Sequence, residues 1–401
     1  MSRKLVFIAA AFATSIFVSA IFSYRGHNTD FPVYYYVAST ILDPQASHED
    51  VYRYPEDTQN KYSIPEKKEA RDLFPYSIPA AYVFAPLALM PYYTAKTTMI
   101  LVNMIAYVFA VATILRSSNA TSREITWGTA ISCLWLPFLH TLGYAQINAL
   151  ILLLVTSAVL AVTRGYPYVC GGLLACAALF KLFPLAIALV LGLRNRRILI
   201  GFSVVFGASF FVPGSTAWIS TLSNFMKEDV RLPTYLWLKS ISPVLIYVYP
   251  AFIGIVTALI ALFAKDDDYS LLTSFAIPAA FLAMPRLGYY HLTLLAFPYG
   301  YLFASKQYRN WPLMGFLFLS AIVLGFPRRG PVEPFIFDPI PNRVYLALFS
   351  LWVVIGIMIF IRSFSRSPRG TDTKRDDGRP TKVGCGTNLL RGYCSESFIL
   401  I

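Results

Sequence analysis

The sequence predicts an all-helical protein that crosses a membrane many times. Of its 401 residues, 56% are hydrophobic and only 14% are charged, whereas ordinary soluble domains contain roughly 25% charged residues. The apolar residues occur in long runs and not in one-sided stripes, which is typical of helices surrounded by lipid. Basic residues gather in the short connections between the runs, as the positive-inside rule requires of cytoplasmic loops.

Ten apolar runs come close to the ~17 to 25 residues that a helix needs to cross a bilayer. In chain order they are Leu5–Tyr24, Ala95–Leu115, Ile125–Leu142, Ala149–Val162, Ile198–Val212, Leu245–Phe263, Leu271–Ala283, His291–Ala304, Trp311–Leu324 and Val344–Ile361. Because a basic start precedes the first run, that run could instead be a cleaved signal peptide with Val18–Ala20 at its cleavage site. The other runs predict membrane insertion in either case.

Two further apolar segments determine the topology. Ser77–Met90 is bounded and interrupted by prolines, which favours a broken or re-entrant segment that does not cross. Tyr168–Leu193 must turn back at Lys181–Pro184 and form two short helices, since a single crossing would place the basic cluster Arg194–Arg197 outside. About twelve crossings result, with both termini in the cytoplasm.

The connection from residue 25 to residue 75 is too long for a simple loop. It mixes charged residues with tyrosines, as expected of interfacial helices near lipid headgroups. With the predicted topology, this connection and most of the unusual polar residues lie on the outer face. We expect residues 1–362 to form one transmembrane domain and residues 363–401 to form a basic, disordered cytoplasmic tail.

Several functional classes lack support in the sequence. The formal net charge of +13 is explained by topology, so a nucleic-acid partner is not expected. The five cysteines and four histidines show no metal-ligand spacing, and no Walker, Rossmann, HExxH or GxSxG motif occurs. Asp266–Asp268 is interpreted as a solvated turn. No cofactor and no metal are predicted.

Asp30 follows the first apolar run directly and precedes a second apolar stretch. An unpaired carboxylate is expensive to bury at a membrane face, which favours a role in proton abstraction or ion pairing. Asp30 is therefore a candidate functional residue.

A series of short motifs resembles glycosyltransferase family 87 of the GT-C superfamily. In collinear order the motifs are DFPVYY (30–35), FPY (74–76), APLA (85–88), QINAL (146–150), GGLL (171–174), FKLFP (180–184) and YYHL (289–292). The chain departs from the family pattern twice, because Pro75-Tyr76 stands for the usual Tyr-Pro-Pro and Ala145 replaces a glycine.

The resemblance implies a GT-C-like catalytic domain over residues 1–362, embedded in the lipid bilayer of the cell membrane with its active site on the outer face. It implies inverting transfer of a sugar from a polyprenyl-phosphate sugar donor to a hydroxyl of a glycolipid or glycan acceptor. A monophosphate donor of this kind needs no metal. Mannose is the expected sugar and arabinofuranose the alternative. A transporter or lipid flippase, which would also have many helices and broken segments, remains the competing class.

The candidate site residues are assigned within this reaction. Asp30 is the base, and Lys181, His291 and Arg286 would stabilise the departing lipid phosphate. The remaining candidates are Gln146 and Asn148 for a sugar, and Tyr34 and Tyr35 for the acceptor groove.

Simpler interpretations stay open for several of these residues. Gln146 and Asn148 could cap a helix, Lys181 could extend to the interface, and His291 could be an interfacial residue without a chemical role. No role is assigned to Arg328, Arg329 and Asp338.

Overall fold

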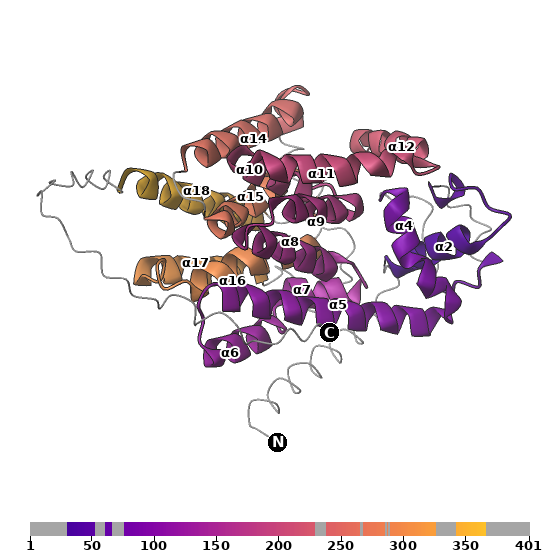
Figure 1. The fold of residues 1–401 in the computed structure, drawn as a ribbon, viewed down its shortest axis with the longest axis horizontal. Coiled ribbons are helices and arrows are strands. Elements are labelled where there is room, and N and C mark those ends of the chain that lie inside the picture. The colour runs from indigo at the N-terminus through magenta and orange to yellow at the C-terminus, as the bar shows by residue number, and fades with distance from the viewer. Residues whose placement is uncertain are drawn as a thin grey trace, which may run out of the picture. The chain divides into compact units, whose positions relative to one another are not determined.

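A computed structural model of the protein describes residues 30–52, 61–65, 76–228, 238–264, 268–284, 287, 289–325 and 342–365. Every regular element in these ranges is a helix (Figure 1), which confirms the predicted all-helical class for this part of the chain. Some predictions fall on residues outside these ranges. They concern the run Leu5–Tyr24, the site residue Arg286, the residues Arg328, Arg329 and Asp338, and the tail beyond residue 365.

The helices follow one another with short connections. In chain order they are α2 (Phe31–Leu42), η1 (Asp50–Tyr52), α4 (Ile78–Phe84), η2 (Ala85–Leu89), α5 (Tyr92–Ser117), α6 (Ser122–Ser132), α7 (Leu136–Gly143), α8 (Asn148–Thr163), α9 (Pro167–Phe180), α10 (Pro184–Arg194), α11 (Arg196–Ala208), η3 (Ser209–Phe211), α12 (Ser215–Glu228), α14 (Leu245–Phe263), α15 (Tyr269–Ala283), η4 (Tyr289–Leu295), α16 (Ala296–Ala304), α17 (Trp311–Gly325) and α18 (Asn342–Ser365). The η elements are 3-10 helices.

Three of the described helices are long and apolar enough to cross a membrane, namely α5, α14 and residues 344–363 of α18. A fourth span would combine α11 and η3 with the start of α12, across a bend of 102°. Six shorter apolar helices lie among them. The chain is therefore consistent with a membrane protein, while the predicted number of about twelve crossings and their orientation stay predictions.

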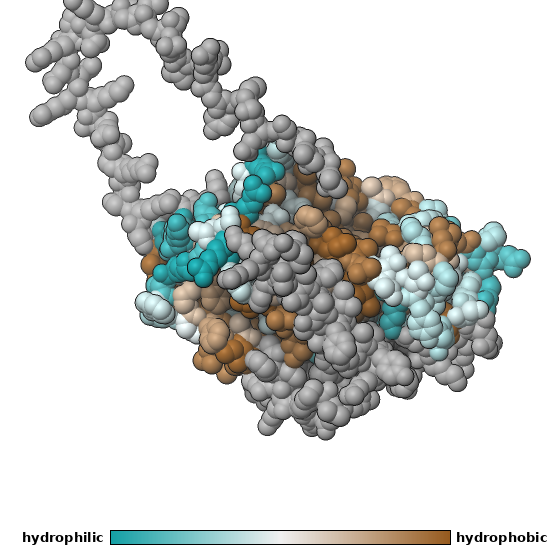
Figure 2. Space-filling view, turned by 90° about the horizontal axis from the view of Figure 1, so that it is seen from below, coloured by the Kyte–Doolittle hydropathy of each residue, from teal (hydrophilic) through white to brown (hydrophobic). Residues whose placement is uncertain are grey.

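The surface of the protein supports membrane insertion. Large apolar side chains are exposed on several helices, among them Phe109 on α5, Val204 on α11 and Phe252 on α14. On the face drawn in Figure 2, a hydrophobic surface lies between hydrophilic patches near the two ends of the horizontal axis. Exposed apolar side chains on a surface of this kind can pack against lipid tails.

The predicted break at Lys181 is confirmed, because α9 ends at Phe180 and α10 begins at Pro184. Lys181 has an extended backbone (φ −151°, ψ 133°), so the helix cannot continue through it. Pro184 lacks the N–H that a helix interior needs, and it stands in the first turn of α10, where that loss is harmless. The two short helices therefore meet at a lysine.

The single span predicted over Ile125–Leu142 is wrong, because the chain forms α6 and α7 with a break at Cys133–Trp135. Pro137 lies in the first turn of α7 and cannot extend a preceding helix. The span predicted over His291–Ala304 is likewise divided, into η4 and α16. His291 therefore lies within a 3-10 helix and not at the start of an α-helix.

Two glycines allow α9 and α11 to pack against each other (Figure 1). A Cβ atom added to Gly171 would lie 2.1 Å from the carbonyl oxygen of Ile198. A Cβ atom added to Gly201 would lie 2.3 Å from the carbonyl oxygen of Tyr168. Both distances are below van der Waals contact, so only glycine permits this approach of the two backbones.

α2 packs against α4, η2 and the start of α5, and Figure 1 shows these elements together at one end of the helices. The ring of Tyr34 stacks on Phe84 at 4.7 Å, and Phe31 meets Tyr92 edge-on at 5.2 Å. Tyr34, Tyr35 and Tyr36 are all buried in the protein, so they do not form an aromatic belt against lipid. This packing fixes the position of Asp30, the N-cap residue of α2.

Candidate functional site

The side-chain amide of Gln146 joins the candidate base to the candidate cation. Its Nε2 donates a hydrogen bond to Oδ2 of Asp30. Its Oε1 accepts a hydrogen bond from Nζ of Lys181 at 3.1 Å. A carboxylate from the start of α2 and an ammonium from the α9–α10 break are thus connected through one neutral side chain. We call Asp30, Gln146 and Lys181 the bridged cluster.

The orientation of the Gln146 amide follows from its neighbours. Its Oε1 accepts hydrogen bonds from the Tyr34 hydroxyl at 2.9 Å as well as from Lys181. An ammonium group can only donate, so an amide turned the other way would set its NH₂ group against Nζ and its carbonyl against the carboxylate of Asp30. Gln146 is buried, and this arrangement holds both charged groups in place.

Lys181 is held on three sides. Its Nζ donates to Oδ1 of Asn148 at 2.9 Å and lies 4.9 Å from the centre of the Tyr290 ring. Burial lowers the pKa of the Lys181 ammonium, and the Asp30 carboxylate opposes this shift. The face of the Tyr290 ring also favours the charged form. Such an arrangement suits a cation that is kept for an anionic ligand.

The capping interpretation of Gln146 and Asn148 is wrong. The N-cap of α8 is Ile147, and this cap has no side-chain hydrogen bond. Both amide side chains turn towards Lys181 instead. Asn148 is fully buried, and its Nδ2 finds no hydrogen-bond partner in the part of the chain that the structure describes.

A tight turn between α7 and α8 places this motif. Ala145 has a φ of +50°, in the left-handed region that favours glycine. This conformation brings the N–H of Gln146 to the carbonyl of Thr141 at 2.8 Å. The carbonyl of Tyr144 accepts the backbone N–H of Asp30 at 3.3 Å. The same turn therefore positions Gln146 and anchors the backbone of the candidate base.

The structure brings some of the predicted residues together and leaves one apart. Tyr34 belongs to the site, since its hydroxyl contacts both Gln146 and the hydroxyl of Tyr76, the latter at 3.0 Å. Tyr35 donates instead to the carbonyl of Met90 at 2.9 Å, which turns its hydroxyl to the start of α5 and not to the bridged cluster. The proposed acceptor groove therefore depends on Tyr34 more than on Tyr35.

His291 lies beside the bridged cluster. It is buried, and its ring lies 4.5 Å from that of Tyr290, the ring that faces Lys181. The third predicted cation, Arg286, is outside the described residues.

Sequence reasoning missed Tyr144 and Tyr290 as site residues. Their rings are 5.8 Å apart and inclined by 46°, and both residues are half-buried. Their positions in the sequence could have indicated them. Tyr144 stands two residues before Gln146, and Tyr290 stands directly before His291. It also overlooked Lys96, a buried lysine in the apolar helix α5.

The described residues contain no group of three His, Cys, Asp or Glu side chains that could hold a metal ion. The bridged cluster itself offers a carboxylate, an ammonium and a neutral amide. The expectation that the reaction needs no metal stays a prediction.

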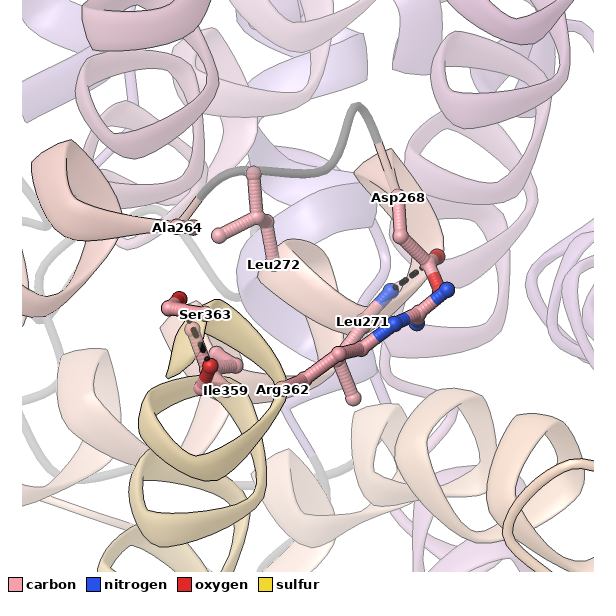
Figure 3. A pocket seen from close by; sticks show the side chains of 7 residues that line it. All are labelled: Ala264, Asp268, Leu271, Leu272, Ile359, Arg362 and Ser363. Carbon is pink, nitrogen blue, oxygen red and sulfur yellow. Dashed lines mark hydrogen bonds and ion pairs between the residues drawn. The ribbon is translucent and has the colours of Figure 1, made fainter. Parts of the chain in front are cut away.

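A second polar cluster lies in another part of the molecule, where Asp268 and Arg362 line a pocket with Ala264, Leu271, Leu272, Ile359 and Ser363 (Figure 3). Its centre is Asp268, whose carboxylate accepts hydrogen bonds from Tyr301 at 2.7 Å and Tyr308 at 3.1 Å. Arg362 on α18 reaches the same carboxylate at 3.0 Å. We call Asp268, Tyr301, Tyr308 and Arg362 the closed cluster.

The prediction of a solvated turn is wrong for Asp268. Its side chain is only 18% exposed, and it caps α15 by accepting the N–H of Leu271 at 2.9 Å. Asp266 and Asp267 are outside the described residues.

In an apolar helical protein, a carboxylate and an ammonium joined at a helix break mark a candidate functional site. Residues 74–242, which are less than half of the chain, match the model of glycosyltransferase family 87. This match supports a GT-C-type glycosyltransferase assignment for the segment and agrees with the resemblance seen in the motifs. No curated protein matches the chain.

The match covers Gln146, Asn148 and Lys181, whereas Asp30 and His291 lie outside it. The family supports transferase activity, and therefore a donor and an acceptor substrate.

Proposed function

We propose that the protein transfers a sugar from a polyprenyl-phosphate donor to a hydroxyl of a glycolipid or glycan at the outer face of the cell membrane. Mannose is the expected sugar. The observation that carries the proposal is the bridged cluster, in which Gln146 connects the Asp30 carboxylate to the Lys181 ammonium. The reaction needs one base and one cation near each other, and the cluster supplies both.

The proposed chemistry is a single displacement with inversion. The acceptor oxygen attacks the anomeric carbon, and its proton passes to the carboxylate of Asp30. As the new glycosidic bond forms, the bond between the anomeric carbon and the phosphate oxygen breaks. The lipid phosphate leaves with the electron pair, and Lys181 and His291 stabilise its added negative charge. Arg286 would act with them.

Lys181 has the hydrogen-bonding capacity for this role. Two of its three N–H groups are used by Gln146 and Asn148, and the third can donate to a phosphate oxygen. Asn148 and Gln146 then orient the ammonium in addition to approaching the sugar. A group that is already positioned needs little reorganisation when charge develops in the transition state.

Arabinofuranosyl transfer is the alternative within the same superfamily, and it would use the same residues. Transport or lipid flipping is the alternative class. A transporter concentrates its ionisable residues near the middle of the membrane between related halves. The bridged cluster instead joins α2, at one end of the helices in Figure 1, to the ends of α7 and α9, which favours an enzyme.

The test is transfer of a radiolabelled sugar from a panel of polyprenyl-phosphate sugars to membrane lipids, with purified protein in nanodiscs. The wild type should form a labelled product with one donor of the panel, and Asp30→Asn should form ~10²- to 10⁴-fold less while it still binds that donor. Transfer from no donor would favour transport, and loss of folding or donor affinity in Asp30→Asn would make Asp30 structural.

Asp43→Asn is the matched control. Asp43 lies at the opposite end of α2 and forms an ion pair with Lys61 at 2.6 Å. The hydrogen bond from Lys61 lowers the pKa of the Asp43 carboxyl to about 2, so this group is also ionised at neutral pH. Asp43→Asn should keep transfer activity, because this carboxylate is remote from Gln146 along α2.

A further inference from the structure

The bridged cluster and its neighbours differ in how much of each side chain is accessible. One group is buried and forms the inner support, comprising Tyr34 (1% exposed), Tyr76 (7%), Gln146 (2%) and Asn148 (0%). The other group is half-buried and comprises Asp30, Tyr144, Lys181 and Tyr290. Among the described residues of this region, the side chains left partly accessible to a ligand are one carboxylate, one ammonium and two phenol rings.

The two rings are fixed from behind. His140 stacks on Tyr144 at 6.0 Å with an angle of 13° between the rings. The Tyr290 backbone is held by its carbonyl, which accepts the hydroxyl of Thr141 at 3.1 Å. The two rings are inclined by 46° at 5.8 Å and together form a bent aromatic wall.

The aromatic wall borders both charged groups. Tyr144 accepts the backbone N–H of Asp30 through its carbonyl, and Asp30 also acts electrostatically on the Tyr144 hydroxyl. On the other side, the ammonium of Lys181 lies 4.9 Å from the Tyr290 ring. The wall therefore lies against the carboxylate at one end and the ammonium at the other.

This combination matches the chemistry of a sugar attached to a phosphate. The C–H groups of a sugar ring carry a small positive charge and pack on the electron-rich face of an aromatic ring. The hydroxyl groups at the ring edge can bond to phenol and carboxylate oxygens. The phosphate on the anomeric carbon would reach the ammonium.

We propose that Tyr144 and Tyr290 bind the sugar ring of the lipid-phosphate donor and make the protein prefer this lipid over the bare lipid phosphate. This inference rests on the proposed function and adds the residues that recognise the sugar. Lys181 supplies affinity for the phosphate that both lipids share, and the aromatic wall supplies the preference for the sugar.

The test measures the binding of two lipids to the full-length protein in nanodiscs, polyprenyl-phosphate mannose and polyprenyl phosphate. The wild type should bind the mannose lipid more tightly. Tyr144→Leu and Tyr290→Leu should each weaken binding of the mannose lipid by ~2- to 12-fold, if the contact contributes the ~0.5 to 1.5 kcal/mol typical of aromatic contacts. Binding of polyprenyl phosphate should stay near the wild-type value.

Two controls accompany these variants. Tyr144→Phe and Tyr290→Phe keep the rings and should keep the preference for the mannose lipid. Tyr247→Leu changes a tyrosine on α14 that is 72% exposed, and it should change neither affinity. If a leucine variant does not fold, the methionine variant at the same position replaces it, since methionine lacks the ring but fills a similar volume.

The possible results separate this inference from the proposed function. If the wild type transfers the sugar but the ring-deleting variants bind both lipids as the wild type does, the sugar-binding role is wrong and the proposed function stands. Equal weakening for both lipids would also overturn the inference, because it would indicate a structural role. If the wild type binds neither lipid and transfers from no donor, both proposals fail.

Discussion

The bridged cluster and the closed cluster each contain one carboxylate and one cation, but the two groups are connected differently. In the closed cluster, Arg362 contacts the carboxylate of Asp268 directly at 3.0 Å, and two tyrosine hydroxyls and a backbone N–H donate to the same carboxylate. In the bridged cluster, the amide of Gln146 stands between Asp30 and Lys181. The closed cluster neutralises its charges within the protein, which suits a structural link. The bridged cluster keeps a carboxylate and an ammonium at a half-buried surface, which suits a reaction.

The largest expected difference between the clusters concerns their cations. Lys181→Met should lower transfer by ~10² to 10³-fold, as loss of one charge-stabilising donor does in other enzymes, with little change in thermal unfolding. Arg362→Met should instead lower stability by about 2 to 4 kcal/mol, because it leaves the Asp268 carboxylate without its counter-charge. Transfer per folded molecule and apparent unfolding temperature, measured in one detergent, check both results. Equal loss of transfer in the two variants would contradict the assignment of a catalytic role to Lys181 and a structural role to Arg362.

The next expected effect concerns the bridge itself. Gln146→Leu should reduce kcat by ~10- to 100-fold, because the base and the cation lose the group that holds their relative positions. Tyr34→Phe removes only one of the two donors to Oε1 of Gln146 and should reduce kcat by less. Steady-state kinetics with the donor identified by the panel checks this order. A Tyr34→Phe variant as weak as Gln146→Leu would show that the bridge is not the controlling contact.

Substitutions in the contact between α9 and α11 should have a smaller effect, and this effect is on the stability of the protein. Gly171→Ala should destabilise the protein by about 1 to 3 kcal/mol, because the added methyl group would meet the Ile198 carbonyl at 2.1 Å. Gly172→Ala is the matched control on α9. Its added Cβ lies 3.5 Å from a methyl group of Val205, an ordinary contact, and the change should stabilise the helix by up to ~1 kcal/mol. Unfolding temperatures that move in the same direction would contradict this account of the α9–α11 contact.

The smallest expected effect concerns the turn that places Gln146. Ala145→Gly should change stability by less than ~1 kcal/mol in the favourable direction. Glycine removes the cost of about 1 to 2 kcal/mol for a left-handed residue, but it adds freedom to the unfolded chain. Ala145→Val should destabilise the protein clearly, since a β-branched residue is strained at a φ of +50°. Thermal unfolding of both variants checks the direction of each stability change. A valine variant as stable as the wild type would refute the left-handed turn.

The sequence predicted much of the fold because apolar runs and prolines mark helices and breaks locally. The prediction of α14 over Leu245–Phe263 is correct at both ends, and the break at Lys181 was inferred from charge placement. Ile125–Leu142 was misread because its hydropathy is continuous while Pro137 divides it. The closed cluster was missed because Asp268 and Arg362 are 94 residues apart, and no local pattern links them.

The residues of the candidate site could be predicted from the sequence, but the hydrogen bonds that join them could not. Asp30, Gln146, Asn148 and Lys181 could be selected because polar residues beside apolar runs are unusual. That Gln146 joins Asp30 to Lys181 depends on the left-handed turn at Ala145. The alanine itself gives no sign of that turn, because alanine rarely adopts it, and the only hint is the glycine that the family pattern has at this position.

The most direct test of the central claim compares the two carboxylates. Asp30→Asn and Asp268→Asn remove one negative charge each without changing the shape of the side chain. Transfer per folded molecule and unfolding temperature should be measured for both, with the donor identified by the panel. We expect Asp30→Asn to lose ~10² to 10⁴-fold in transfer while its unfolding temperature stays near that of the wild type. Asp268→Asn should unfold earlier and keep its transfer. Substantial transfer by Asp30→Asn, or early unfolding of that variant with loss of donor binding, would contradict the assignment of Asp30 as the base.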